Sequence, residues 1–340
     1  MLRSRPARRL MVAVLFLLIV DAFVPSALRR LEEARYEDVV QDFRFENSDL
    51  FGVGPLLAYL AERPSGRQPR VMFLGNSVIY GYGLSAAEAV PGQYQRLQRS
   101  EKVFNAGVNG FDPASIYLVA KAAIAAIDRI YVLSRTYDPG IPTMVGRRVP
   151  IDDEDARRFG VAMPDATEEY LQRVADQWAL YRHSYRLQAA LLGTSARQYL
   201  YLHKGTFARR LFATLTARTI AAQTDTEVLA TAPLATEMPA PERLHAVRSA
   251  SSDLLWSFGE LARSQGKTLV ILQVPGFSEW LPDANAVADF NRVFFPFARV
   301  VLLSVPAAQM SDGMHLTAAG AAALALALSR ERAVYESLPR

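Results

Sequence analysis

Short runs of apolar residues recur along the chain, and each ends in glycine, asparagine, serine or another polar residue. Five of these runs are nearly all apolar, as strands covered on both faces are: residues 70–74, 103–104, 129–133, 268–274 and 299–303. Pro91 suits the first turn of one intervening helix, and Asp112 with Pro113 suits the start of another. Thr317 suits the cap of a last helix, which we expect to end near Arg330. The alternation predicts an α/β fold with an open, largely parallel sheet and helices on both sides.

The amino terminus has a different pattern. Four arginines, at positions 3, 5, 8 and 9, precede an apolar stretch over residues 10–28 that Asp21 interrupts. A helix needs about 20 mostly apolar residues to cross a bilayer, and basic residues favour the cytoplasmic side. We therefore predict a cytoplasmic tail (1–9) and a single-pass anchor (10–28) in the inner, or plasma, membrane, with the rest of the chain on the periplasmic or extracytoplasmic side. A cleaved signal peptide with a site around Val20-Asp21-Ala22 is the alternative.

The composition narrows the chemistry. Of the 340 residues 51% are hydrophobic, which excludes a disordered or collagen-like chain. The absence of cysteine removes thiol nucleophiles, thiolate zinc sites and iron–sulfur clusters, and it fits an oxidising compartment. The net charge of +4 comes with no basic run interleaved with aromatic residues, so nucleic acid is a poor candidate for a partner.

The organisation after the anchor has three predicted parts. Residues 29–69 predict a charged helical stalk followed by a Gly/Pro-containing connector, and residues 70–335 predict the main domain. Within that domain, residues from about 140 to 265 show no clear strand and predict a mostly helical insertion. The helical patterns in it cover residues 168–192 and 199–222. The acidic run at residues 152–155 predicts a solvated loop, with an acidic metal site as the alternative.

Reactive residue types follow the predicted strands. Ligands of open α/β sheets bind beyond the carboxyl ends of the strands. The polar groups at that edge are Gly75-Asn76-Ser77, residues 107–110, residues 135–138, and Asp312 with His315. Because four loops carry such residues to one edge, we expect the functional site there.

These segments resemble the sequence blocks of the SGNH/GDSL hydrolases. Residues 73–77 with 80–83 resemble the first block, residues 105–110 the second, and residues 311–317 with Gly320 the last. The resemblance covers roughly residues 70–138 and 268–330. It implies a flavodoxin-like, three-layer parallel sheet, with a serine nucleophile in the first block, an oxyanion donor in the second, and Asp and His in the last.

Carried over residue by residue, the resemblance implies Ser77 as the nucleophile, with His315 and Asp312 completing a triad. The backbone N–H groups of Ser77 and Gly110 become the oxyanion donors. Chemistry gives an independent reason: a serine hydroxyl attacks only when an imidazole takes its proton, and a carboxylate must orient that imidazole. No cofactor and no metal is expected. The alternatives are Ser77 as a helix N-cap and His315 as a structural histidine.

The sequence departs from the family pattern at two places. Asn76 replaces the Asp that usually precedes the nucleophile. In the third block, Tyr137 stands where the family has an Asn that donates to the oxyanion, and losing such a donor costs about 100- to 1,000-fold in rate. Arg135, Asn109 or the Tyr137 hydroxyl would have to replace it, or the site is slow or inactive.

The context of the predicted site favours one function. An anchored, extracytoplasmic SGNH-like domain resembles the proteins that O-acetylate exported polysaccharides beside a multi-span membrane acyltransferase. We expect a membrane-anchored O-acyltransferase or acylesterase that acts on an envelope or secreted glycan, with the glycan or an acyl ester as its substrate. The alternatives are a plain lipase or esterase and a non-catalytic SGNH-like subunit of a membrane complex.

Overall fold

We describe the protein from a computed structural model of the chain. The residues that it describes are 5–35, 41–46, 53–62, 66, 68–110, 113–133, 152–159, 166–184, 187–188, 191, 227–231, 253–273, 298–304, 307–311 and 315–336.

Five parallel strands form the body of one sheet. They are β3 (Arg70–Gly75), β4 (Lys102–Asn109), β5 (Arg129–Leu133), β7 (Thr268–Gln273) and β8 (Ala298–Ser304). The order across the sheet is β1-β4-β3-β5-β7-β8-β6, and every contact among the five is parallel. All five predicted strands and their parallel arrangement are confirmed.

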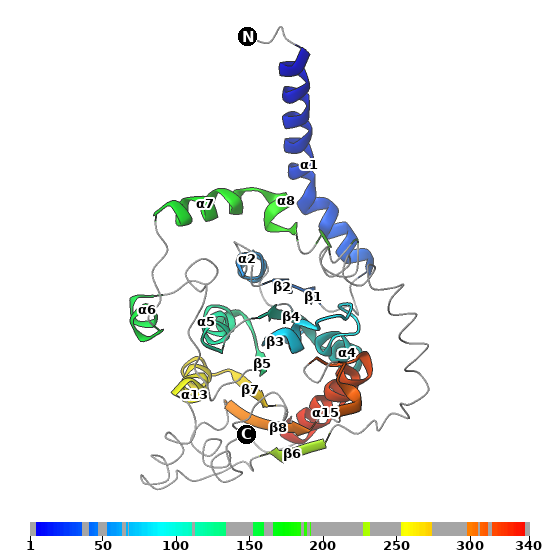
Figure 1. Ribbon diagram of the computed structural model, residues 1–340, viewed down its shortest axis with the longest axis vertical. Coiled ribbons are helices and arrows are strands. Elements are labelled where there is room, and N and C mark those ends of the chain that lie inside the picture. Colours follow the sequence, from blue (N-terminus) through cyan, green and yellow to red (C-terminus); the bar gives the residue numbers. More distant parts are fainter. Residues whose placement is uncertain are drawn as a thin grey trace.

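Helices cover both faces of this sheet, as predicted (Figure 1). One face packs on α3 (Ser77–Tyr80), α4 (Val90–Leu97) and α15 (Ala318–Glu336); the other packs on α2 (Gly54–Glu62), α5 (Pro113–Ala123) with the 3-10 turn η1 (Ile124–Ala126), and α13 (Asp253–Gln265). The strands serve both layers by alternation, since in β3 Phe73 faces α4 and α15 while Met72 and Leu74 face the other helices. The result is an α/β fold of three layers.

The predicted helix starts lie where expected. Pro91 is in the first turn of α4, and α5 begins at Pro113; Asp112 lies outside the described residues. The Thr317 hydroxyl oxygen accepts a hydrogen bond from the Gly320 N–H at 3.1 Å, so Thr317 caps α15.

Helix α1 (Arg5–Arg35) projects from the domain (Figure 1). Its segment Arg8–Leu28 is long and apolar enough to cross a membrane. Most of that segment is exposed, but Val24 and Leu28 are buried against the rest of the chain.

The segment predicted as stalk and connector contributes to the sheet and to the core. Strands β1 (Gln41–Asp42) and β2 (Phe45–Glu46) both pair in parallel with β4, and α2 adds Leu56 and Tyr59 to the hydrophobic core. Between the two strands, the buried Arg44 guanidinium pairs with the buried Asp42 carboxylate at 2.8 Å. The α/β domain therefore includes residues well before 70.

The predicted insertion holds both helices and a strand. It contains α6 (Asp153–Phe159), α7 (Ala166–Gln177), α8 (Ala179–Arg182) and β6 (Glu227–Thr231). Strand β6 pairs antiparallel with β8 at the edge of the sheet, so the expectation of no strand there was wrong. The helical pattern at residues 199–222 lies outside the described residues.

The acidic run at residues 152–155 is the start of a helix rather than a solvated loop. The Lys121 ammonium on α5 donates to the carboxylates of Asp152 at 2.9 Å and Asp155 at 2.5 Å, and Asp155 is buried. The hydrogen bond from Lys121 lowers the pKa of Asp152. These contacts hold α6 against α5, which explains the acidic run without a metal.

Candidate active site

Ser77 lies at the point where the sheet changes its direction of winding. Strand β3 is placed between β4 and β5. The chain leaves β3 through α4 on one face, and leaves β4 through α5 on the other face. Open α/β sheets bind their ligands at such a switch point, beyond the carboxyl ends of the strands. Ser77 comes two residues after β3 and so lies at this edge.

The backbone around Ser77 is fixed by its neighbours. The Asn76 side-chain oxygen accepts a hydrogen bond from the Val78 N–H at 3.1 Å, so Asn76 is the N-cap of α3 and Ser77 is its first residue. Gly81 ends the helix with φ +74°, and its N–H donates to the Ser77 carbonyl at 3.0 Å. Asn76, and not Ser77, therefore caps α3, and the interpretation of Ser77 as the N-cap is wrong.

Two glycines let the α3 backbone settle onto the strand ends. A Cβ at Gly107 would lie 2.2 Å from the Tyr80 backbone nitrogen, and a Cβ at Gly75 would lie 2.8 Å from Ile79 Cγ1 on α3. In β4, the buried Asn105 side-chain oxygen accepts a hydrogen bond from the Gly107 N–H at 3.0 Å, which fixes the strand backbone beneath α3. The height of Ser77 above the sheet depends on both glycines.

His315 reaches Ser77 from a turn just before α15. His315 Nε2 lies 3.1 Å from Ser77 Oγ, and both side chains are half-buried. The turn is held by the Ser311 N–H, which donates to the His315 carbonyl at 2.7 Å, and by the Thr317 N–H, which donates to the Gln309 carbonyl at 2.8 Å. The structure thus brings together the serine and the histidine predicted from the sequence.

Sequence reasoning missed a second contact of the His315 imidazole. The Tyr82 ring packs on the His315 ring, with centroids 4.8 Å apart and planes tilted by 34°. The turn that carries Tyr82 is in turn held by Arg44, whose Nη1 donates to the carbonyl oxygens of Tyr80 at 2.8 Å and Leu84 at 3.1 Å. The repeated Tyr-Gly pairs at residues 80–83 were the only sequence signal for this support.

The other predicted site residues fall into two groups. Gly110 and Asn109 lie at the end of β4, beside the β3 end that leads to Ser77, and Gly110 has φ +74°. Asp312, Arg135 and Tyr137 lie outside the described residues. Over the part of the chain that the structure describes, no group of three or more His, Asp or Glu side chains could hold a metal ion.

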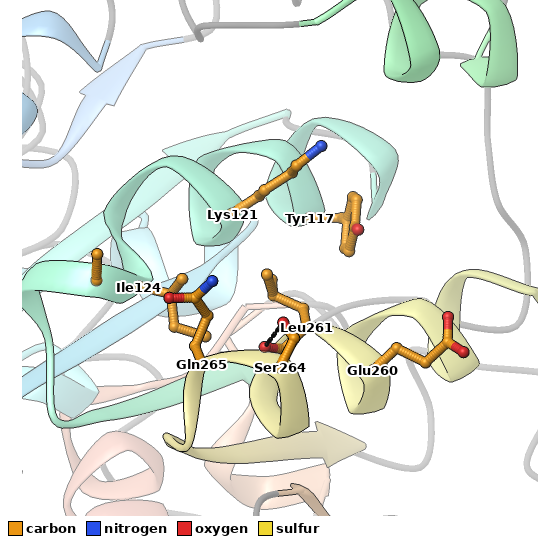
Figure 2. Close-up of a pocket in the computed structure, with 8 residues that line it drawn as sticks. Tyr117, Lys121, Ile124, Glu260, Leu261, Ser264 and Gln265 are labelled. Atoms are coloured by element: carbon orange, nitrogen blue, oxygen red, sulfur yellow. Dashed lines mark hydrogen bonds between the residues drawn. The ribbon is translucent and has the colours of Figure 1, made fainter.

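A hollow of about 410 Å³ lies elsewhere, between α5 and α13 (Figure 2). Figure 2 shows Tyr117 and Lys121 on α5 across from Glu260, Leu261 and Ser264 on α13. These helices cover the face opposite α3 and lead into the amino ends of β5 and β7. The hollow is therefore separated from Ser77 by the sheet.

The pair of Ser77 and His315 supports one elementary step. A histidine nitrogen at hydrogen-bond distance can accept the serine proton as the oxygen attacks an electrophilic carbon. Neither a scan against models of known protein families nor a search of curated proteins found a match for this chain.

Proposed function

We propose that this protein is a serine O-acyltransferase or acylesterase of SGNH type, anchored in the inner membrane by α1 and acting on an extracytoplasmic glycan. The distance of 3.1 Å between Ser77 Oγ and His315 Nε2 carries the proposal. The strand order β4-β3-β5-β7-β8 is 2-1-3-4-5 in chain order, which supports a flavodoxin-like sheet. The apolar segment Arg8–Leu28 and the arginines before it support the anchor and its orientation.

The proposed first half-reaction forms an acyl-enzyme. Ser77 Oγ attacks the carbonyl carbon of an acyl ester while its proton passes to His315 Nε2. The negative charge on the carbonyl oxygen is met by the backbone N–H groups of Ser77 and Gly110. The C–O bond to the leaving group then breaks, and the leaving oxygen takes the proton from His315. Asp312 is proposed to orient the imidazole through its other nitrogen.

The second half-reaction decides between transfer and hydrolysis. A glycan hydroxyl or a water molecule attacks the acyl carbon, His315 accepts its proton, and Ser77 Oγ leaves with that proton. The same residues serve both outcomes, so the acceptor that reaches the acyl-enzyme decides the product. A multi-span membrane acyltransferase is the proposed source of acyl groups for the transfer reaction.

Labelling with a fluorophosphonate probe tests the nucleophile. We expect the detergent-solubilised protein to be labelled, Ser77→Ala to lose the label, and Ser264→Ala, at an exposed serine of α13, to keep it. Turnover of p-nitrophenyl acetate in the presence of an oligosaccharide acceptor, followed by mass spectrometry of the oligosaccharide, then separates acyl transfer, which gives an acetylated oligosaccharide, from plain esterase activity, which gives only acetate. A protein that is neither labelled nor active, even beside its membrane partner, would instead be a non-catalytic subunit. Tyr137 in place of the oxyanion Asn favours that second candidate.

A further inference from the structure

The contact between α1 and the domain lies inside the apolar segment of α1. Val24 and Leu28 are buried there, and the Asp21 carboxylate accepts a hydrogen bond at 2.6 Å from the Leu180 N–H of α8. All three α1 residues belong to the segment Arg8–Leu28. The domain therefore touches the anchor within the stretch that would lie in the bilayer.

Helix geometry gives the depth at which this contact would lie in the bilayer. The twelve steps from Arg9 to Asp21 rise about 18 Å at 1.5 Å per residue, whereas the hydrocarbon core is about 30 Å thick. If α1 spans the bilayer, as the proposed function requires, the outer leaflet must extend past Asp21. The elements in contact with Asp21 then lie at the level of that leaflet.

Helix α7, which precedes α8, has one apolar side, as expected of a helix at the level of the outer leaflet. Residues 170, 171, 174 and 175 fall on one side of the helix by their spacing, and they are Tyr, Leu, Val and Ala; Trp178 follows directly after the helix. On this side Tyr170 is 60% exposed and Leu171 46%, and Trp178 just after the helix is 43% exposed. The exposed residues Glu169 and Arg173 lie on the other side. An apolar side with large exposed aromatic residues is costly in water.

The orientation of α7 relative to α1 suits a helix that lies along the membrane surface. Figure 1 shows α7 running across the direction of α1, with α8 at the point where α1 enters the domain. Beside Trp178 lies a hollow of about 400 Å³, lined by Ala175, Trp178, Leu180, Tyr181 and Ser184.

We propose that α7 is an interfacial membrane helix, lying on the outer leaflet with its Tyr170 and Leu171, and Trp178 directly after it, among the lipid headgroups and upper acyl chains. Tyr and Trp favour this zone because it accommodates both their rings and their polar atoms. An amphipathic helix lies in the interface plane with its apolar side toward the acyl chains. The occupant of the exposed side is phospholipid, and the proposal rests on α1 being the anchor.

Single cysteines test the proposal cleanly, because the chain has none of its own. Nitroxide labels at Leu171→Cys and Trp178→Cys report the apolar side, and labels at Glu169→Cys and Arg173→Cys report the polar side. A label at Leu15→Cys reports α1. The full chain is placed in vesicles of phosphatidylcholine and phosphatidylglycerol, and collision rates with oxygen and with a water-soluble nickel chelate are measured. A thermal midpoint equal to that of the unlabelled protein shows that each variant is folded.

We expect the ratio of oxygen to nickel collisions to be highest at Leu15, clearly raised at Leu171 and Trp178, and low at Glu169 and Arg173. If Leu15 is deep but Leu171 and Trp178 match Glu169, the interfacial helix is wrong while the anchor stands. Labels at Leu171 and Trp178 shielded from both reagents would show that protein, such as a second copy, covers this side, and would also overturn the proposal. A shallow Leu15 would remove the anchor itself.

Discussion

His315 Nε2 lies 3.1 Å from Ser77 Oγ although 238 positions separate the two residues in the chain. Ser77 is placed by β3 and the short helix α3, and His315 by the turn before α15. Two independent parts of the fold thus converge on one hydrogen bond, with both side chains half-buried. This geometry makes the serine the natural target for the first test.

Removing either partner should abolish turnover of acyl esters. We expect Ser77→Ala and His315→Ala each to lower kcat for p-nitrophenyl acetate by on the order of 10⁴-fold or more, and the double variant to lose no more than either alone, because the two side chains act as a unit. Additive losses in the double variant would show that the residues act independently. Ser264→Ala serves as the control and should keep full activity.

Gly107 should be intolerant of a side chain. Gly107→Ala places a Cβ 2.2 Å from the Tyr80 nitrogen, so α3 must move away from β4 and carry Ser77 with it. We expect unfolding in urea to show a loss of about 1–3 kcal/mol and turnover to fall by about 100-fold. The matched control is Gly66→Ala, where the added Cβ meets nothing within 4 Å. Equal behaviour of the two variants would contradict the close approach of α3.

The buried ion pair behind the site should be essential for stability. Arg44→Met leaves the buried Asp42 carboxylate without its bidentate partner, and it also removes the donors to the Tyr80 and Leu84 carbonyls. We expect a loss of about 3–5 kcal/mol in the free energy of unfolding. Adding Asp42→Leu should recover part of it. Arg96→Met, at an exposed position of α4, should change stability by no more than about 0.5 kcal/mol.

Tyr82 should position the His315 imidazole through its ring rather than its hydroxyl. Tyr82→Leu should lower kcat/KM about 2- to 10-fold, as expected from the loss of an aromatic contact of about 0.5–1.5 kcal/mol. Tyr82→Phe keeps the ring and should stay close to wild type. A large loss in the Phe variant would assign the hydroxyl a direct part in the reaction.

Tyr137 tests whether the oxyanion site is weakened. If it occupies the place of the missing Asn, Tyr137→Asn should raise turnover by about 10-fold or more, because an amide donor joins the backbone donors. Tyr137→Phe distinguishes two cases: unchanged turnover means that the hydroxyl donates nothing, and a large loss means that it replaces the Asn. Rates of acyl-ester hydrolysis measure both.

The sheet could be predicted from sequence because its central strands are covered on both faces. Strands such as β3 and β5 then appear as uninterrupted apolar runs. Strands β1 and β2 were missed because each is only two residues long. The buried Arg44 between them adds to the difficulty, because the sequence alone does not distinguish a buried arginine from an exposed one. Strand β6 was missed because an edge strand pairs on one side only and needs no such run.

The candidate site was predicted in part, from short local segments. Ser77, Gly110 and His315 lie in short segments whose residue types and spacing are distinctive. The packing of Tyr82 on His315 joins segments far apart in the chain, and no local pattern encodes it. The role of Asn76 as the N-cap was also missed, although Asn is among the preferred residues at that position.

The order of the strands has a consequence for when activity can arise. A chain is synthesised from its amino end, so β3, β4 and β5 can pair while β8 and α15 are still unmade. At about 5–20 residues per second, roughly 10 to 50 seconds separate the synthesis of Ser77 from that of His315. Throughout this interval the serine has no base beside it. If the chain is exported and Ser77 is the nucleophile, as proposed, it crosses the membrane without an activated nucleophile, and its reactivity begins only when its last helix docks.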